Sequence, residues 1–453
     1  MIQHLLSLVL TLFAAAAVAQ NEKGSDAKGL VVLHCGQLLA EPGQEPLREA
    51  TVVIKDGVIT NVLNGIAFID AAPGMPQNTH IDLTDKFVLP GLIDCHTHLT
   101  FELPPMQMRL RKQLTEDATY EAVDGTHNAR KTLMAGFTTV RNVGSGGAAI
   151  YALRNRINEG VIPGPRILAA GKSISVTGGH ADPTNGINPA LSPALTSTDG
   201  IANGPDQFRH ATRERIRQGS DLIKITSTGG VLSNTAAGLG QQMFDDEIEA
   251  VVQTAHMMGR KVACHAHGTD GINAALRAGV DSIEHGSYLD ESSIELFLET
   301  GAYLVPTIHA GKFVGEKAAD PAWFNPAIKE KAQAVGPIIQ DALARAHKAG
   351  VKVAFGTDVG VGAHGTNALE FVYMVEAGFT PADAIKAATI NAADLCGLGG
   401  SVGKIAKGYQ ADIIALDASP LEDVTALQNV TFVMKGGEVY KDKLQDSAQT
   451  SAD

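Results

Sequence analysis

Side chains that bind metals or move protons stand where short apolar runs of this chain end. His96 and His98 come first, two residues apart, so on an extended backbone their imidazoles project to the same side. Two imidazoles that converge in this way can hold a divalent metal ion. Later apolar runs carry or end in Lys224, His265, His285 and Asp358. Each residue alone has an ordinary structural explanation, but the whole set predicts a binuclear metal centre.

Lys224 is the member of this set that needs chemistry of its own, because an ammonium group cannot ligate a cation. It lies in the apolar run 221–226, where its stem could simply pack while the ammonium reaches solvent. Reaction of a buried lysine with carbon dioxide would instead give a carbamate, whose two oxygens can reach one metal each. The binuclear interpretation therefore requires a carboxylated Lys224.

Between residues 89 and 399, apolar strands alternate with helical patterns, which is typical of an α/β fold with a parallel sheet. The predicted strands are 92–96, 138–143, 166–170, 222–226, 262–265, 282–285, 303–306 and 353–357. The predicted helices include 120–135, 205–218, 245–258, 271–278, 292–299 and 338–348. Eight such units predict a closed TIM-type (β/α)8 barrel, whose catalytic groups sit at the carboxyl ends of the strands. An open doubly wound sheet is the alternative, but it would normally place a glycine-rich phosphate loop where His-Thr-His stands.

Both ends of the chain carry short alternating runs with turns between them. Asp56-Gly57 between two β-branched runs is a strong hairpin signal, and a similar pattern returns at 411–440. Neither block has enough strands to bury a sheet alone. We therefore predict one small β-sandwich composed of residues 28–88 and 400–442, beside the barrel of residues 89–399.

The formal net charge of -13 argues against nucleic acid as a partner and gives no sign of a basic membrane-binding patch. Residues 5–18 are apolar and lead into Ala17-Val18-Ala19, a small-x-small cleavage pattern, although no Lys or Arg precedes them. We predict a cleaved signal peptide over residues 1–19 and a periplasmic or secreted mature protein. No later stretch reaches transmembrane length.

The strand-end set resembles that of the amidohydrolase superfamily, in its binuclear carboxylated-lysine type. The likeness rests on His-x-His on the first predicted strand, Lys on the fourth, His on the fifth and sixth, and Asp on the eighth. The run Pro-Gly-Leu-Ile-Asp-Cys-His-Thr-His at 90–98 and the segment 404–412 agree with it. Residues 173–182 and 227–231 resemble in particular the imidazolonepropionase-related branch, which includes metal-dependent Xaa-Pro and Xaa-Arg dipeptidase-like enzymes and ochratoxin-hydrolysing amidohydrolases. The resemblance covers residues 28–442.

The resemblance implies two divalent metal ions, with zinc (Zn²⁺) as the first choice, although manganese, cobalt or iron suit the same ligands. The ligands carried over are His96, His98 and Asp358 for the more buried ion, His265 and His285 for the more exposed one, and carboxylated Lys224 as the bridge. His265 is preferred over His267 because its spacing from the other ligands matches the family. Relatives of this kind are often homo-oligomers, and we expect a homo-oligomer here.

The same resemblance gives catalytic roles to residues at the predicted barrel mouth. A hydroxide held between the two ions would attack the amide carbonyl, and Asp358 would accept its proton and pass it to the leaving amine. His180 and His267 would face the substrate and polarise its carbonyl oxygen. A role in shaping its own glycine-rich loop is the alternative for His180.

The predicted substrate is a small molecule or dipeptide with a free carboxylate. The backbone of Gly229 and Gly230 can approach that carboxylate closely, and Arg141 is a further candidate partner, with an internal salt bridge as the alternative for the arginine. We predict an exported metal-dependent hydrolase that cleaves the amide before a C-terminal amino acid, in dipeptides, N-acyl amino acids or ochratoxin-type amides. A cyclic-amide hydrolase like the imidazolonepropionases, a non-catalytic binding protein and a mononuclear iron site are the alternatives.

Overall fold

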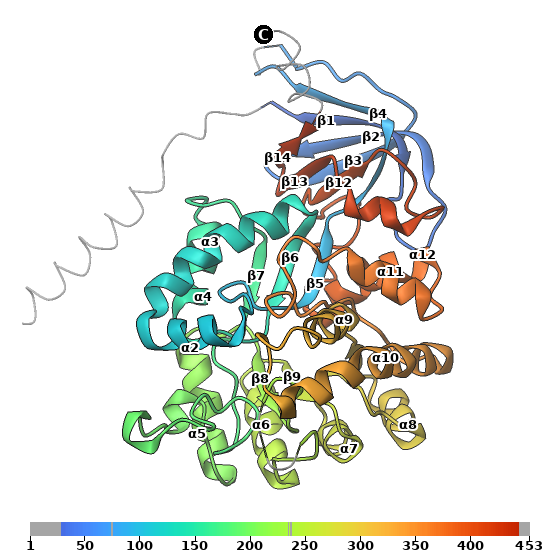
Figure 1. Cartoon of the computed structure of the whole chain (residues 1–453). Helices are drawn as coiled ribbons and strands as arrows, with labels where there is room; N and C mark the ends of the chain where they lie inside the picture. The colour runs from blue at the N-terminus through green and yellow to red at the C-terminus, as the bar shows by residue number, and fades with distance from the viewer. Residues whose placement is uncertain (1–28, 74–75, 234, 236–237, 444–453) are drawn as a thin grey trace, which may run out of the picture.

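The computed structural model describes residues 29–73, 76–233, 235 and 238–443. The predicted signal peptide lies outside these described residues. Within them, no helix combines the length and the apolar character needed to cross a membrane. The described chain consists of a sheet at one end and a larger part in which strands and helices alternate (Figure 1).

A seven-stranded sheet is built from both ends of the chain (Figure 1). Its strands, in spatial order, are β14 (Glu438–Asp442), β13 (Phe432–Lys435), β12 (Ile413–Leu416), β4 (Thr79–Pro90), β1 (Val31–Leu38), β2 (Leu47–Lys55) and β3 (Val58–Asn64). The central strand β4 pairs parallel with β1 and antiparallel with β12. The prediction that the two chain ends share one β structure is confirmed, whereas its sandwich form stays a prediction.

The hairpin predicted at Asp56-Gly57 joins β2 to β3, which pair antiparallel. Both turn residues have positive φ, 51° for Asp56 and 81° for Gly57, as a two-residue turn between right-twisted strands requires. Close approach also constrains Gly57, because a Cβ here would lie 2.6 Å from the carbonyl oxygen of Gly436 in the β13–β14 turn. The turns of the two hairpins at opposite ends of the sheet therefore touch.

The larger part contains two parallel sheets. The first consists of β5 (Leu92–Thr97), β6 (Phe137–Asn142) and β7 (Arg166–Ala169), and the second of β8 (Ile223–Thr226), β9 (Val262–Ala266), β10 (Ser282–His285) and β11 (Tyr303–Val305). Single parallel bridges connect them: Ile174 with Ile225, Leu304 with Val353, and Thr97 with Val359. The pairings thus run in a circuit from β5 through β11 and back to β5.

The eighth predicted strand, 353–357, is an irregular segment with one bridge at Val353. It still lies between its expected neighbours, since the N–H of Ala354 donates to Leu304 and that of Cys95 donates to Phe355. The N–H of Phe355, however, donates to Ala387, which is not part of a strand, so no regular ladder forms. Gly356 permits the close fit, because a Cβ here would lie 2.3 Å from Val305 Cγ1.

Helices lie around the outside of these strands (Figure 1). They are α2 (Met106–Thr115), α3 (Ala118–Met134), α4 (Ala149–Asn158), α5 (Pro205–Arg217), α6 (Asp245–Met257), α7 (Thr269–Ala278), α8 (Glu291–Thr300), α9 (Ile308–Lys317), α10 (Pro326–Ala349), α11 (Leu369–Glu376), α12 (Pro381–Lys386) and α13 (Ala392–Leu395). Five of the six predicted helices match within a few residues. The sixth, predicted from 338, begins at Pro326, because α10 continues through Gly336 and Pro337.

Candidate active site

A cavity lies at the carboxyl ends of the parallel strands. The strand-end residues predicted as metal ligands, together with the two histidines predicted to face a substrate, all line this cavity: His96, His98, His180, Lys224, His265, His267, His285 and Asp358. Residues that are up to 262 positions apart in sequence therefore meet at one point, as the positions of the apolar runs predict.

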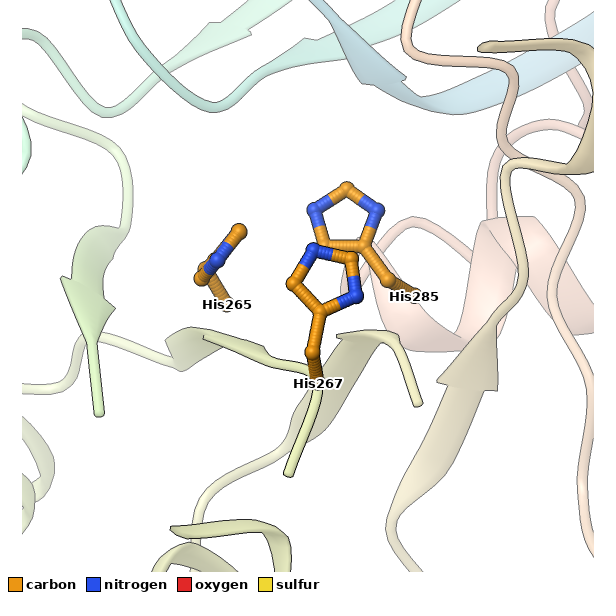
Figure 2. A group of neighbouring side chains, drawn as sticks. All are labelled: His265, His267 and His285. Carbon is orange, nitrogen blue, oxygen red and sulfur yellow. The ribbon is translucent and has the colours of Figure 1, made fainter. Parts of the chain in front are cut away.

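Two overlapping groups of side chains have the spacing of metal ligands. His265, His267 and His285 form one group, and His96, His285 and Asp358 form the other; in each, the candidate ligand atoms lie within 4.8 Å of one another. Figure 2 shows the first group, with three imidazoles converging from two neighbouring strand ends. His285 belongs to both groups, so the two positions lie side by side.

Hydrogen bonds fix how three of these imidazoles are turned. Nδ1 of His96 lies 2.8 Å from Glu284 Oε2, Nδ1 of His98 lies 3.0 Å from the Gly144 carbonyl, and Nδ1 of His285 lies 2.7 Å from Thr307 Oγ1. These contacts leave Nε2 of each ring for a metal, which is the usual arrangement around protein metal ions.

His265 is turned the other way. Its Nε2 lies 3.4 Å from the Gly229 carbonyl oxygen, which leaves Nδ1 for a ligand. His267, in contrast, has its Nδ1 engaged at 2.6 Å with Ser287 Oγ. Both rings are therefore held in position by their surroundings, and each presents one free nitrogen.

Backbone strain gathers at the same place. His285 (φ 73°), Thr307 (φ 58°) and Asp358 (φ 60°) all adopt the left-handed conformation, which side chains other than glycine avoid. Each such residue costs on the order of 1–3 kcal/mol, and such strain is concentrated at functional sites. This strain energy falls on the proposed ligands His285 and Asp358 and on Thr307, which holds His285.

Asp358 supplies an ionised carboxylate whose bonding is incomplete. Its Oδ1 is buried without a hydrogen-bond donor among the described residues, although His98 Nε2 lies 3.1 Å and His96 Nε2 lies 3.6 Å away. Burial raises the pKa of Asp358, but His96, His98 and Lys224 outweigh burial and hold that pKa below its usual value. An anionic oxygen facing two imidazole nitrogens is a donor set that fits a divalent cation.

Burial favours the neutral form of four further proposed ligands, His96, His265, His285 and Lys224. It is the largest cause that lowers the pKa of His96 to about 4, followed by the charge of Lys224, and it lowers the pKa of His265 and of His285 well below the usual value. Burial likewise lowers the pKa of Lys224. Neutral imidazole is the form that binds metals, and a neutral amine is the form that can attack carbon dioxide.

His180 enters the cavity from the loop after β7. Its ring stacks on that of His265, with the centroids 4.1 Å apart and the planes inclined by 18°. Its Nδ1 is buried and has no hydrogen-bond partner among the described residues. Gly230 makes room for it, because a Cβ on Gly230 would lie 2.2 Å from Cε1 of His180.

Arg141 is one of three predicted site residues that the structure does not place in the lining of the cavity. Its guanidinium is buried and donates to Glu284 Oε1 at 2.7 Å, to Ser282 Oγ at 3.0 Å and to the Cys95 carbonyl at 2.6 Å. The internal salt bridge is therefore the observed role of Arg141, because the buried carboxylate of Glu284 requires a cation. Gly229 and Gly230 are also absent from the described lining of the cavity, and they act instead on His265 and His180.

Several functional contacts were not predicted from sequence. Glu284 orients His96, and its position directly before His285 at a strand end was the signal that could have identified it. Thr307 has no such signal, since its contact with His285 depends on its left-handed backbone.

One side of the cavity is apolar. Ala310 and Val314 of α9 line it together with Val335 and Ile339 of α10, and Val231 and Leu232 complete that side from the loop after β8. The two helices approach closely where Gly311 faces Gly336, since a Cβ on Gly311 would lie 3.1 Å from Gly336 Cα. This wall suits a neutral, apolar part of a ligand.

Imidazoles, a lysine and a carboxylate around a cavity at parallel strand ends form a donor set that fits the class of metal-dependent hydrolases. Residues 87–440 match the family model described as the Amidohydrolase family, and the chain belongs to this family. It is a hydrolase that acts on amide bonds.

Similarity to known proteins extends over almost the whole chain. Ochratoxinase from Aspergillus niger is 34% identical over 447 residues, covering 92% of this chain and 88% of that protein. The crystal structure of a Xaa-Pro dipeptidase with bound methionine in the active site superposes with a TM-score of 0.87 at 42% identity, covering 91% of this chain and 100% of the other. Imidazolonepropionase from Nocardia farcinica (strain IFM 10152) is 26% identical over 414 residues, 84% of this chain and 90% of that enzyme. The predicted family and branch are confirmed.

Proposed function

We propose that this protein is a binuclear metal amidohydrolase that cleaves the amide bond before a C-terminal amino acid, in dipeptides, N-acyl amino acids or ochratoxin-type amides. The observation that carries the proposal is the pair of ligand groups that share His285 beside the buried Lys224. Similarity to a Xaa-Pro dipeptidase crystallised with methionine in its active site, and to an ochratoxinase, supports this substrate class.

His96, His98 and Asp358 would hold one ion, His265 and His285 would hold the other, and Lys224, as its carbamate, would serve both. The carbamate forms when the neutral amine of Lys224 attacks the carbon of carbon dioxide and releases one proton. Two Zn²⁺ ions held here would lower the pKa of water and polarise a carbonyl oxygen.

The chain's own residues then divide the remaining work. The Asp358 carboxylate takes a proton from the attacking water and returns it to the nitrogen of the departing amine. His180, with its free Nδ1, and His267, fixed by Ser287, hold the substrate carbonyl in place. The apolar wall of α9 and α10 excludes water from its side of the cavity.

We also propose the architecture of the chain and the location of the mature protein. The circuit of strands in residues 89–399 is a TIM-type (β/α)8 barrel, and residues 28–88 and 400–442 form a composite β-sandwich. The bridges that join the two parallel sheets support the barrel. The apolar leader and its Ala-Val-Ala motif support cleavage after residue 19 and export to the periplasm or the exterior. We extend the expectation of a homo-oligomer to this protein on the resemblance alone.

One experiment tests the function directly. Purified protein is analysed for metal content and assayed against dipeptides, N-acyl amino acids, ochratoxin A and an imidazolone ring, before and after treatment with a chelator. We expect about two divalent ions per chain and hydrolysis of the linear amides that chelation abolishes. Full activity without metal would contradict the proposal, and a preference for the ring would favour the cyclic-amide alternative.

A further inference from the structure

Lys331 of α10 ties this helix to the loop after β8. Its ammonium donates to the Gly230 carbonyl at 2.8 Å and to the Ser233 carbonyl at 2.6 Å. The two residues between these carbonyls, Val231 and Leu232, line the cavity. The ammonium group therefore lies next to a segment of the cavity lining.

The helix places Lys331 on the side that faces the cavity. Val335 and Ile339 follow it at four and eight residues, so the three side chains lie along one face of α10, and the two apolar ones line the cavity. Lys331 lies one turn before them on this face of α10, next to the described lining of the cavity rather than in it.

Few positively charged side chains are available to bind a substrate carboxylate in this cavity. Among the described residues that line it, the formally charged ones are Lys224 and Asp358, and both belong to the proposed metal centre. Arg141 is committed to Glu284. An ammonium has three N–H donors, and Lys331 uses two of them on backbone carbonyls, which leaves one for a ligand.

We propose that Lys331 is the residue that recognises the free carboxylate of the leaving amino acid, whose apolar side chain lies along the wall of α9 and α10. The inference rests on the proposed function and narrows its substrates to amides whose leaving amino acid is apolar and has a free C-terminus. It assigns to Lys331 the role that the sequence suggested for Arg141.

The test compares N-acetyl-L-phenylalanine with N-acetyl-L-phenylalaninamide as substrates of the metal-loaded enzyme, with acetate release as the readout. For Lys331→Met we expect kcat/KM for the acid to fall about 10- to 100-fold, mainly through KM, since a charge-assisted hydrogen bond is lost. Activity toward the amide should stay within threefold, so the selectivity for the acid collapses. Lys331→Arg keeps the charge and should retain most of that selectivity.

A purely structural role of Lys331 as a loop tether would lower kcat/KM for both substrates alike, and that outcome would overturn the inference. Lys329→Met is the matched control, because it removes the same charge from the same helix two residues away, where no side-chain partner is found among the described residues. This variant should behave as the wild type.

Binding measured by calorimetry separates this inference from the proposed function. The wild type should bind L-phenylalanine at least tenfold more tightly than L-phenylalaninamide, and Lys331→Met should lose the difference. If the wild type hydrolyses neither substrate but shows this Lys331-dependent binding, the proposed function fails and the carboxylate site stands. If it hydrolyses both substrates equally and Lys331→Met changes nothing, the carboxylate site fails and amide hydrolysis stands.

Discussion

Two buried charged side chains outside the cavity lining, Glu284 and Arg141, fix the orientation of His96. Glu284 accepts from Ser282 and Arg141 through one oxygen and contacts His96 Nδ1 through the other. Burial raises the pKa of Glu284, but the charge of Arg141 and the contact with His96 outweigh burial and hold that pKa far below its usual value. A permanent carboxylate thus stands behind His96, where it strengthens the imidazole as a ligand.

Glu284→Gln tests this arrangement while keeping the shape of the side chain. Loss of the charge behind a metal-binding histidine costs about 10- to 100-fold in metal affinity or activity. We expect this loss in zinc affinity, measured by competition with a chelator, and in kcat for a dipeptide. Glu249→Gln, at an exposed position of α6, is the control and should leave both unchanged. Wild-type zinc affinity in Glu284→Gln would mean that the carboxylate serves only to pair Arg141.

Lys224→Ala removes the proposed bridge between the ions. We expect metal content to fall well below two ions per chain and hydrolysis to be lost, because no other described side chain at that point offers two oxygens. Added formate, acetate or propionate should partly restore both, since a short carboxylate can occupy the vacated position. A variant with normal metal content and normal rate would show that the lysine has only a structural role.

At the scale of elements, the apolar wall depends on how closely α9 and α10 pack. A Cβ on Gly311 would lie 3.1 Å from Gly336 Cα and 3.3 Å from Ile339 Cδ1, a cavity-lining side chain. Gly311→Ala should therefore push the helices apart and cost about 1–3 kcal/mol of overpacking, against a gain in helix propensity of up to about 1 kcal/mol.

We expect Gly311→Ala to lower the free energy of unfolding in urea and to raise KM for substrates with a large apolar leaving group. Gly315→Ala is the matched control one turn later on α9, where the nearest atom is the Ala332 carbonyl oxygen at 3.4 Å. That contact is ordinary, so this variant should be neutral or slightly stabilising. Equal behaviour of the two variants would contradict the importance of the close approach.

Glu370 of α11 fixes the start of α9, because its two oxygens accept from the N–H groups of Ile308 and His309 at 2.9 and 2.6 Å. The first turn of α9 follows Thr307, which holds His285. Burial raises the pKa of Glu370 to about 8. The two backbone donors lower this pKa, but burial outweighs them. A pKa raised in the folded state means that the folded protein binds the proton more tightly than the unfolded chain does.

The stability that Glu370 contributes is therefore complete below its unfolded pKa of about 4.5 and decreases as pH rises toward 8. Glu370→Gln cannot titrate, so its stability deficit relative to the wild type should shrink between pH 4.5 and 8. Urea unfolding of both proteins across this range measures the difference, in which other titrating groups cancel. A deficit that is constant with pH would show that Glu370 is ionised throughout.

The elements and their ends could be predicted where a local pattern defines them. Apolar runs that end in His, Lys or Asp predicted where His265, His285 and Asp358 meet, because parallel strands bring their carboxyl ends together. Local patterns do not predict the direction in which a side chain points. Arg141 lies near the end of its strand as the ligands do, but its side chain forms an ion pair with Glu284.

The start of α10 shows a second limit of local pattern. A proline inside a helix removes one hydrogen bond and normally ends or kinks it, so residues before Pro337 were not predicted as helical. In the structure, packing of Gly336 against Gly311 and burial of Val335 and Ile339 stabilise the helix through the proline. This packing is tertiary and has no counterpart in the sequence of α10 itself.

At the scale of the whole molecule, the seven-stranded sheet is attached to the strand circuit by charged contacts. Arg166 of β7 contacts Asp412 at 2.7 Å, and Lys435 and Lys441 donate to the carbonyls of Gly164 and Met134 at 2.6 and 2.9 Å. Asp412 also accepts from the Gly436 N–H at 2.8 Å, so one buried carboxylate links both parts. The chain ends thereby brace the circuit near the amino ends of β6 and β7, whereas the cavity lies at the carboxyl ends of the strands.

The metal centre should be the corresponding brace at the cavity end, since its proposed ligands come from β5, β8, β9, β10 and the segment after 357. A metal that binds the folded chain alone stabilises it by about 4 kcal/mol when its concentration is 1,000 times its dissociation constant. We therefore expect the chelated protein to melt several degrees below the zinc-loaded one, because a chain of this size shifts by about 1 °C for each kcal/mol lost. Differential scanning calorimetry measures the shift, and Lys224→Ala, with its ligand set broken, should show little response to zinc. Identical melting of the chelated and loaded wild type would mean that no metal joins these strands, because binding to the folded state alone must raise its stability.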